Sequence, residues 1–158
     1  IVYDIRLPPS TFRCAPCAPF RITRSDLDVP LDPSRPASIR LISRDFPWAF
    51  DVHETSRGAG VSCRAILASL YDALQAPLAD HEWGFSSDDL RQRMVRAWER
   101  RGPLEGGTMA RIPFLKRVDF LGTRCKLQGF CRDKEFVSRR VLPGTRPVPD
   151  TWIVRFMD

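Results

Sequence analysis

IRLISRDFPWAFDVHETSRGAGVSCRAILASLYDAL, residues 39–74, is the stretch that decides the fold class. Apolar and polar side chains alternate over 37–43 and again over 48–54, which is the two-residue period of a strand. Pro47 cannot donate to a strand ladder and separates the two runs. We therefore expect a β-hairpin with a half-buried second strand. The buried face of that second strand is predicted to carry Trp48, Phe50 and Val52.

Two amphipathic helices are predicted further along the chain. The first follows a glycine loop, begins after an N-cap at Ser62 and ends at Pro77. The second begins after Ser86 or Ser87, has acidic residues at its positive end and stops at Gly102. The residues predicted to face the core are Ile66, Leu67, Leu70 and Leu74 in the first helix, and Leu90, Met94, Ala97 and Trp98 in the second.

Three further strands are expected in the second half of the chain. Apolar residues alternate over 116–122, and a Gly-Thr turn leads into 123–130, which favours another hairpin. A polar, proline-bearing loop over 132–150 precedes the final strand, 151–156. Since strands and helices are partly segregated along the chain, we predict an α+β fold. It consists of a mostly antiparallel sheet with the two main helices packed on it.

The beginning of the chain differs in composition from the rest. Residues 1–36 contain seven of the fourteen prolines, each of which fixes φ and removes a backbone donor. We expect 1–36 to form an extended, proline-rich arm laid over an α+β core of 37–158, with 1–7 as a short edge strand. At 158 residues the chain fits a single domain, 1–158. The missing initial Met suggests an excised domain or a processed chain.

Seven motifs follow one another along the chain: YDIRLPP, ASIRLISRDFPWAFDV, GVSCRAILASLYDAL, RQRMVRAWERRG, KRVDFLG, LQGF and TWIVRF. In this order they resemble a fungal, mainly basidiomycete, family of unknown function. Its members share a Pro-Trp strand turn, an Arg-Val-Asp strand and a final Trp strand. This chain departs from the family where VSCRAIL replaces V-T-V-x-D-V-L, and its late loop is longer. The resemblance supplies no activity, so no catalytic residue is carried over.

Positive charge is concentrated in the second half of the chain. Residues 1–90 carry 9 basic and 12 acidic side chains, whereas 91–158 carry 16 basic and 7 acidic ones, within a net charge of +6. Such asymmetry can mark a polyanion-binding face, and it also fits a solvated, arginine-rich surface. The candidate nucleic-acid or polyanion-binding residues are Arg91, Arg93, Arg96, Arg100, Arg101, Lys116, Arg117 and Arg124.

Cys14 and Cys17 have the C-x-x-C spacing of zinc and thiol-redox sites. A zinc site needs two further ligands, and Cys125 with Cys131, or the two histidines, lack a matching spacing. We favour two arm thiols without a metal, free or joined in a disulfide if the protein is exported. The odd total of five cysteines favours a reducing compartment, cytoplasmic or nuclear. Secretion after removal of a signal peptide stays an open alternative.

One nucleophile set can be written from the sequence. Cys63, near a helix N-terminus, would have a lowered pKa, with His53 as its base and Asp51 as the partner of that base. A core position for Cys63 and a surface position for His53 explain the same pattern more simply. Asp119, flanked by apolar residues, is expected to form a structural salt bridge. Phosphate-loop, dinucleotide, zinc-protease and serine-hydrolase motifs do not occur in the sequence. We therefore predict no enzyme, no catalytic residue, and no cofactor or metal.

The function predicted first is a non-catalytic protein-interaction or scaffold domain with an unidentified protein partner. Its docking surface would be the proline-rich arm or the 132–150 loop. One alternative is a nucleic-acid or polyanion-binding module, and another is a secreted fungal effector or a small thiol-dependent enzyme. No run of about 18 apolar residues occurs, so no membrane span is expected.

Overall fold

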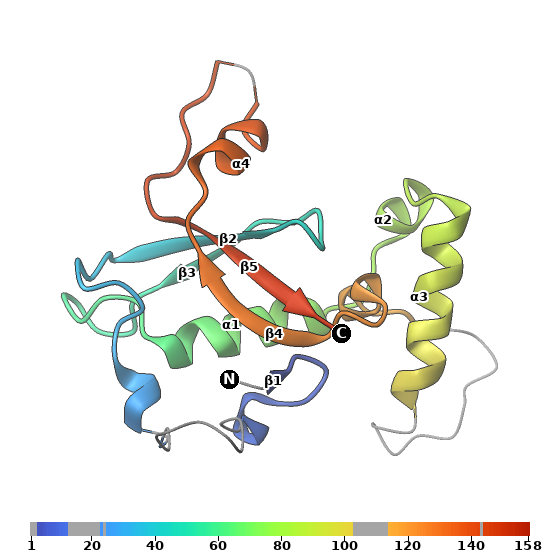
Figure 1. Cartoon of the computed structure of the whole chain (residues 1–158), viewed down its shortest axis with the longest axis horizontal. Coiled ribbons are helices and arrows are strands. Elements are labelled where there is room, and N and C mark those ends of the chain that lie inside the picture. The colour runs from blue at the N-terminus through green and yellow to red at the C-terminus, as the bar shows by residue number, and fades with distance from the viewer. Residues whose placement is uncertain (1–2, 13–22, 24, 103–113, 143) are drawn as a thin grey trace.

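A five-stranded sheet with the strand order β1-β4-β5-β2-β3 organises the protein (Figure 1). The computed structural model describes residues 3–12, 23, 25–102, 114–142 and 144–158. Three neighbouring strand pairs are antiparallel and one is parallel. The prediction of a single α+β domain with a mostly antiparallel sheet is confirmed.

The predicted hairpin forms one side of this sheet. It consists of β2 (Ser38–Ser43) and β3 (Phe50–His53), and it buries Val52 as the alternation requires. The expected last strand, β5 (Thr151–Met157), lies in the middle of the sheet. It runs parallel to β2 on one side and antiparallel to β4 on the other. β5 therefore joins the hairpin on one side of the sheet to β4 and β1 on the other.

The first predicted helix, α1 (Cys63–Gln75), covers one face of the sheet. It begins where predicted, because the Ser62 side chain accepts a hydrogen bond from the Ala65 N–H at 3.2 Å. Its apolar stripe packs against the inward side chains of β2, β3 and β5 in one core. The buried residues of this helix are Ile66, Leu67, Leu70 and Leu74, the four that the spacing predicted.

The second predicted helix, α3 (Asp88–Arg101), lies beside the sheet and packs mainly against a 3-10 helix, η4 (Arg117–Leu121). The Ser87 side chain caps its first turn by accepting a hydrogen bond from the Leu90 N–H. Met94 and Ala97 are buried as expected, together with a charged residue that the apolar pattern did not include. That third buried residue of the helix is Arg101.

The prediction of a strand over 116–122 is wrong, because η4 occupies that position. The Asp119 carboxylate accepts a hydrogen bond from the Lys116 N–H at 2.8 Å and closes the first turn. Val118 and Leu121 are buried three residues apart, which is the period of a 3-10 helix. The hairpin expected between this segment and 123–130 therefore does not form.

The strand expected in 123–130 is β4 (Lys126–Cys131), which pairs with β5 and with the edge strand β1 (Tyr3–Asp4). The polar loop predicted over 132–150 contains a short helix, α4 (Lys134–Arg139). Another short helix, α2 (Asp80–Gly84), has no counterpart in the predicted elements. Among the described residues, no helix has both the length and the apolar character needed to cross a membrane.

The described part of the proline-rich arm, which precedes α1 in the chain, packs along that helix. Two short 3-10 helices, η1 (Pro9–Thr11) and η2 (Ser25–Asp28), contact this helix. The Leu31 N–H donates to the Val61 carbonyl at 3.0 Å just before α1 begins. The arm also enters the core, since Tyr3 is 1% exposed.

Candidate functional site

The candidate site is the face of the sheet opposite α1, which we call the outer face. Its central residues in β2 and β5 are Arg40, Ile42, Thr151, Ile153 and Arg155, since the residues between them point to the core. The parallel register places Arg40 beside Thr151 and Ile42 beside Ile153. The centre of the outer face is thus a pair of buried isoleucines, 4% and 2% exposed, with arginines on either side.

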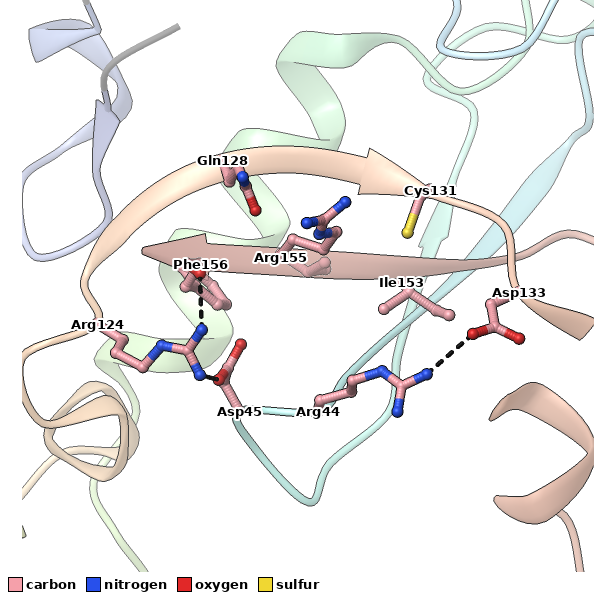
Figure 2. A pocket seen from close by; sticks show the side chains of 10 residues that line it. Arg44, Asp45, Arg124, Gln128, Cys131, Asp133, Ile153, Arg155 and Phe156 are labelled. Carbon is pink, nitrogen blue, oxygen red and sulfur yellow. Dashed lines mark hydrogen bonds and ion pairs between the residues drawn. The ribbon is translucent and has the colours of Figure 1, made fainter. Parts of the chain in front are cut away.

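A hollow of about 360 Å³, the strand hollow, opens on the outer face between β4, β5 and the residues after β2. Two ion pairs frame it: Arg44 with Asp133 at 2.9 Å, and Arg124 with Asp45 at 2.6 Å. Figure 2 shows the Arg124–Asp45 pair on the left and the Arg44–Asp133 pair on the right, with the Cys131 thiol on the side of the Arg44–Asp133 pair. The other residues that line it are Gln128, Ile153, Val154, Arg155 and Phe156.

A second hollow of about 420 Å³, the helix hollow, separates the outer face from α4 and the loop that follows α4. Its charged lining residues are all arginines, Arg40, Arg139, Arg140 and Arg146. Asp51 pairs with Arg40 and Glu135 pairs with Arg139 outside the hollow. Aliphatic side chains and prolines make up nearly all of the remaining lining: Ile42, Pro47, Ala49, Val137, Val141, Pro147 and Val148.

Phe136 of α4 contacts one arginine of each hollow. The guanidinium carbon of Arg44 lies 4.3 Å from its ring centroid, and that of Arg140 lies 5.9 Å from it. Arg140 also donates a hydrogen bond to the Pro47 carbonyl at 2.6 Å. Since cation–π contacts and hydrogen bonds restrict a flexible side chain, α4 positions one arginine of each hollow.

Asp133 supports the same arrangement from the N-terminus of α4. Its carboxylate accepts a hydrogen bond from the Phe136 N–H at 3.0 Å and pairs with Arg44. The Phe136 N–H, with a smaller contribution from Arg44, lowers the pKa of Asp133 below its ordinary value. Asp133 therefore stays ionised at neutral pH, as a structural partner of Arg44 and not as a proton donor.

Two of the seven arginines that line the hollows differ from the other five in their contacts. Within the part of the chain that the structure describes, the side chains of Arg146 and Arg155 have no hydrogen-bond or ion-pair partner. Both are exposed, and one lines each hollow. Their donors are therefore available to a ligand.

The eight basic residues predicted to bind polyanions lie on α3, on and before η4, and in the turn before β4. Arg93, Arg96 and Arg100 are exposed on α3 at spacings of three and four residues, so they share one stripe of that helix. Arg101 is 2% exposed and does not face solvent. The contacts of the others are Arg91 with Asp88, Lys116 with Gln75, Arg117 with Glu82, and Arg124 with Asp45.

The nucleophile set written from the sequence does not assemble. Burial raises the pKa of the Cys63 thiol, whereas the sequence-based expectation was a lowered one. Asp51 is engaged by two hydrogen bonds from Arg40, at 2.7 and 2.6 Å. Asp51 and His53 belong to the outer face, and Cys63 belongs to the helix that covers the opposite face.

Cys14 and Cys17 lie outside the described residues. Cys63, Cys125 and Cys131 are free thiols. Among the residues that the structure describes, no three histidine, cysteine, aspartate or glutamate side chains are grouped so that they could hold a metal.

The chain belongs to DUF6699, a family of unknown function, whose family model matches residues 1–140. No curated protein and no solved structure matches the chain. The family resemblance read from the motifs is thereby confirmed as far as a family of unknown function, and it brings no activity with it. The matched range ends within the loop before β5, although β5 is the central strand.

The sequence interpretation missed most of the outer-face arginines. A signal for them exists in the strand alternation, because SIRLISR places its two arginines on the same side and TWIVRF places its arginine opposite its tryptophan. The arginines after α4 have no periodicity that would assign them to a surface. The missed residues are Arg40, Arg44, Arg139, Arg140, Arg146 and Arg155.

Proposed function

We propose that the protein is a non-catalytic protein-binding domain that holds its partner against the outer face. The observation that carries this proposal is the pair of hollows on the outer face, which are lined by seven arginines and, in the helix hollow, by aliphatic side chains and prolines. Arginines around a partly apolar surface are typical of protein interfaces, in which arginine is enriched and anchors the partner.

The chemistry of the lining supports binding more than catalysis. Asp45 and Asp133, the carboxylates of the strand hollow, are both engaged by arginines. A general base needs a carboxylate or imidazole that is free to take a proton from a substrate. Lining residues of this kind would position a partner through charge and shape.

Polyanion binding by α3 is a second candidate function. The exposed stripe of Arg93, Arg96 and Arg100 favours it, since regularly spaced cations can contact successive phosphates. The full set of eight basic residues stays a prediction. Binding to mixed-sequence DNA or RNA at about 50 mM salt that weakens steeply as salt rises would support it. Lack of binding at that salt concentration would reject it.

The fungal origin and the cytoplasmic or nuclear location are also part of the proposal. The free thiols of Cys63, Cys125 and Cys131 support a reducing compartment. Mass measurement of the protein from its native source, after thiol labelling, tests this point. Five free thiols would support the proposed location, and a disulfide would favour the exported form instead.

The protein-binding function is tested by affinity capture with matched variants. The first variant is Arg146→Glu with Arg155→Glu on the outer face, and the control is Arg96→Glu with Arg100→Glu on α3. A specific partner should be captured by the wild type and the control and lost by the outer-face variant. It should then bind the purified wild-type protein in a calorimeter. Equal capture by both variants would place the binding surface elsewhere and reject the proposal.

A further inference from the structure

The geometry points to an acidic peptide as the ligand of the outer face: an extended segment whose glutamates or aspartates surround aliphatic side chains. This inference rests on the proposed protein-binding function and specifies the chemistry of the partner. The supporting observations are the positive charge of the two hollows and the aliphatic side chains that line the helix hollow.

The lining of the two hollows is strongly positive. Seven arginines and two aspartates line the two hollows, and the two aspartates belong to the strand hollow. If the outside partners of Arg40 and Arg139 are also counted, the region keeps an excess of three positive charges. An arginine guanidinium presents paired N–H groups that match the two oxygens of a carboxylate. The site therefore complements a segment that carries several carboxylates.

The positions of Arg146 and Arg155 indicate how an extended ligand would lie across the outer face. Arg155 lies in β5 and lines the strand hollow, whereas Arg146 lies in the loop after α4 and lines the helix hollow. Ile42 and Ile153, which pair side by side in β2 and β5, line the helix hollow and the strand hollow respectively, but they are only 4% and 2% exposed. A segment whose acidic groups reach both arginines therefore meets the half-buried valines of the helix hollow, Val137, Val141 and Val148, and not the two buried isoleucines.

The lining of the helix hollow favours a peptide over a single-stranded nucleic acid. Nucleic-acid bases are bound by stacking on exposed aromatic rings. The described residues that line this hollow include no aromatic side chain and consist mainly of valines, prolines and arginines. Phe156, which lines the strand hollow, is 2% exposed and belongs to the core. Aliphatic side chains of a peptide fit the lining of the helix hollow, whereas bases find no aromatic ring in that lining. The nearby half-buried ring of Phe136 is already faced by the guanidinium groups of Arg44 and Arg140.

The arginines that do have partners are held in a binding arrangement before the ligand arrives. Arg44 is fixed by Asp133 and by the ring of Phe136, and Arg140 by the Pro47 carbonyl and the same ring. Binding then costs less side-chain entropy than it would with free arginines. Phe136 is therefore a positioning residue for the ligand, without needing to touch it.

The test uses the whole protein and a fluorescein-labelled peptide of about twelve residues with leucines between glutamates. The control peptide carries glutamine at every glutamate position. Fluorescence anisotropy should show binding of the acidic peptide alone, weakened about tenfold by Arg146→Gln with Arg155→Gln. The matched variant Arg96→Gln with Arg100→Gln removes the same charge from α3 and should change the affinity less than about twofold.

Three results would overturn the inference. The first is equal binding of the glutamate and glutamine peptides, and the second is an equal loss in both double variants. The third is tighter binding of a single-stranded DNA of about twenty nucleotides that depends on the outer-face arginines. If the acidic peptide fails while a captured partner still requires the outer face, the acidic-peptide inference is wrong and the protein-binding function stands. If capture does not depend on the outer face, the proposed function itself is wrong.

Discussion

Arg101 and Asp119 form an ion pair inside the protein. Nε and Nη2 of Arg101 each donate to one carboxylate oxygen of Asp119 at 2.9 Å. The two side chains are 3% and 2% exposed. Arg101 ends α3 and Asp119 lies in η4, so the pair joins the two elements that pack beside the sheet.

Among substitutions that keep the shape of a side chain, Asp119→Asn should be one of the most destabilising in this protein. It keeps the shape of the side chain but leaves the Arg101 charge buried without its counter-charge. We expect the free energy of unfolding to fall by about 3–5 kcal/mol in urea denaturation followed by circular dichroism. Glu99→Gln, on the exposed side of α3, is the control and should cost less than about 0.5 kcal/mol. Similar losses in both variants would show that the pair is not needed for stability.

Glu82 makes the stability depend on pH in the acid range. Burial acts to raise its pKa, but hydrogen bonds from Arg117, the Ala79 N–H and Trp48 outweigh burial, so the pKa is lowered from 4.5. A carboxylate with a lowered folded-state pKa stabilises the protein above its unfolded pKa, and this contribution disappears as pH falls through the folded pKa.

Comparison of the wild type with Glu82→Gln isolates this contribution. At pH 7 the wild type should be more stable by about 1.5–3 kcal/mol, the range for hydrogen bonds to a charged group. The difference should shrink progressively below pH 4.5, the ordinary pKa of glutamate. Urea denaturation at a series of pH values measures it. A difference that does not vary with pH would contradict the role assigned to the Glu82 charge.

Gly60 should tolerate alanine less well than Gly58. Both glycines have positive φ, +75° and +79°, and both donate their N–H to the Glu54 carboxylate. A Cβ at Gly60 would come within 2.7 Å of the Arg35 Cα, whereas nothing lies within 4 Å of a Cβ at Gly58. Left-handed backbone costs alanine about 1–2 kcal/mol, so Gly58→Ala should lose that amount.

The excess loss in Gly60→Ala then measures the collision with the Arg35 backbone. We expect it to add about 1–3 kcal/mol, the range found for overpacked sites. Thermal denaturation of the two single variants side by side provides the comparison. Equal melting temperatures would mean that the loop moves to admit the methyl group.

Cys131 and Cys125 should differ in reactivity towards iodoacetamide. Burial raises the pKa of the Cys125 thiol to about 11, and its side chain donates to the Gly122 carbonyl. Cys131 lines the strand hollow and is half-buried. Since the thiolate is the reactive form, Cys131 should be labelled in the native protein and Cys125 after unfolding in guanidinium. Peptide mass mapping follows both sites, and early labelling of Cys125 would contradict this order.

The sequence correctly predicted the elements whose structure is determined by local features alone, such as residue spacing, a helix cap or a proline. The α1 stripe, its Ser62 cap and the β2–β3 hairpin all occur where spacing and proline placed them. The alternation of apolar residues over 116–122 predicts a strand. A tertiary contact decides its structure instead, since the Asp119 carboxylate both closes the first turn of η4 and receives Arg101 from α3.

The candidate site was harder to predict than the fold. An arginine run marks a helix surface in the sequence, but it does not tell which arginine is buried, as Arg101 shows. The outer-face arginines come from segments more than a hundred residues apart, such as β2 and β5, which the parallel pairing brings together. Local patterns carry no information about such pairings.

The central place of β5 has a consequence for the time course of folding. The Ser43 hydroxyl bonds to the Val154 carbonyl across 111 residues, and β5 is the last of the described strands to be synthesised. Contacts between such distant residues slow folding. Until β5 leaves the ribosome, β2 and β4 each display an unpaired backbone edge, which is a template for aggregation. Protease sensitivity of stalled nascent chains with and without 151–157 would measure this interval. A newly made chain of this protein therefore exposes two strand edges until its final strand closes the sheet.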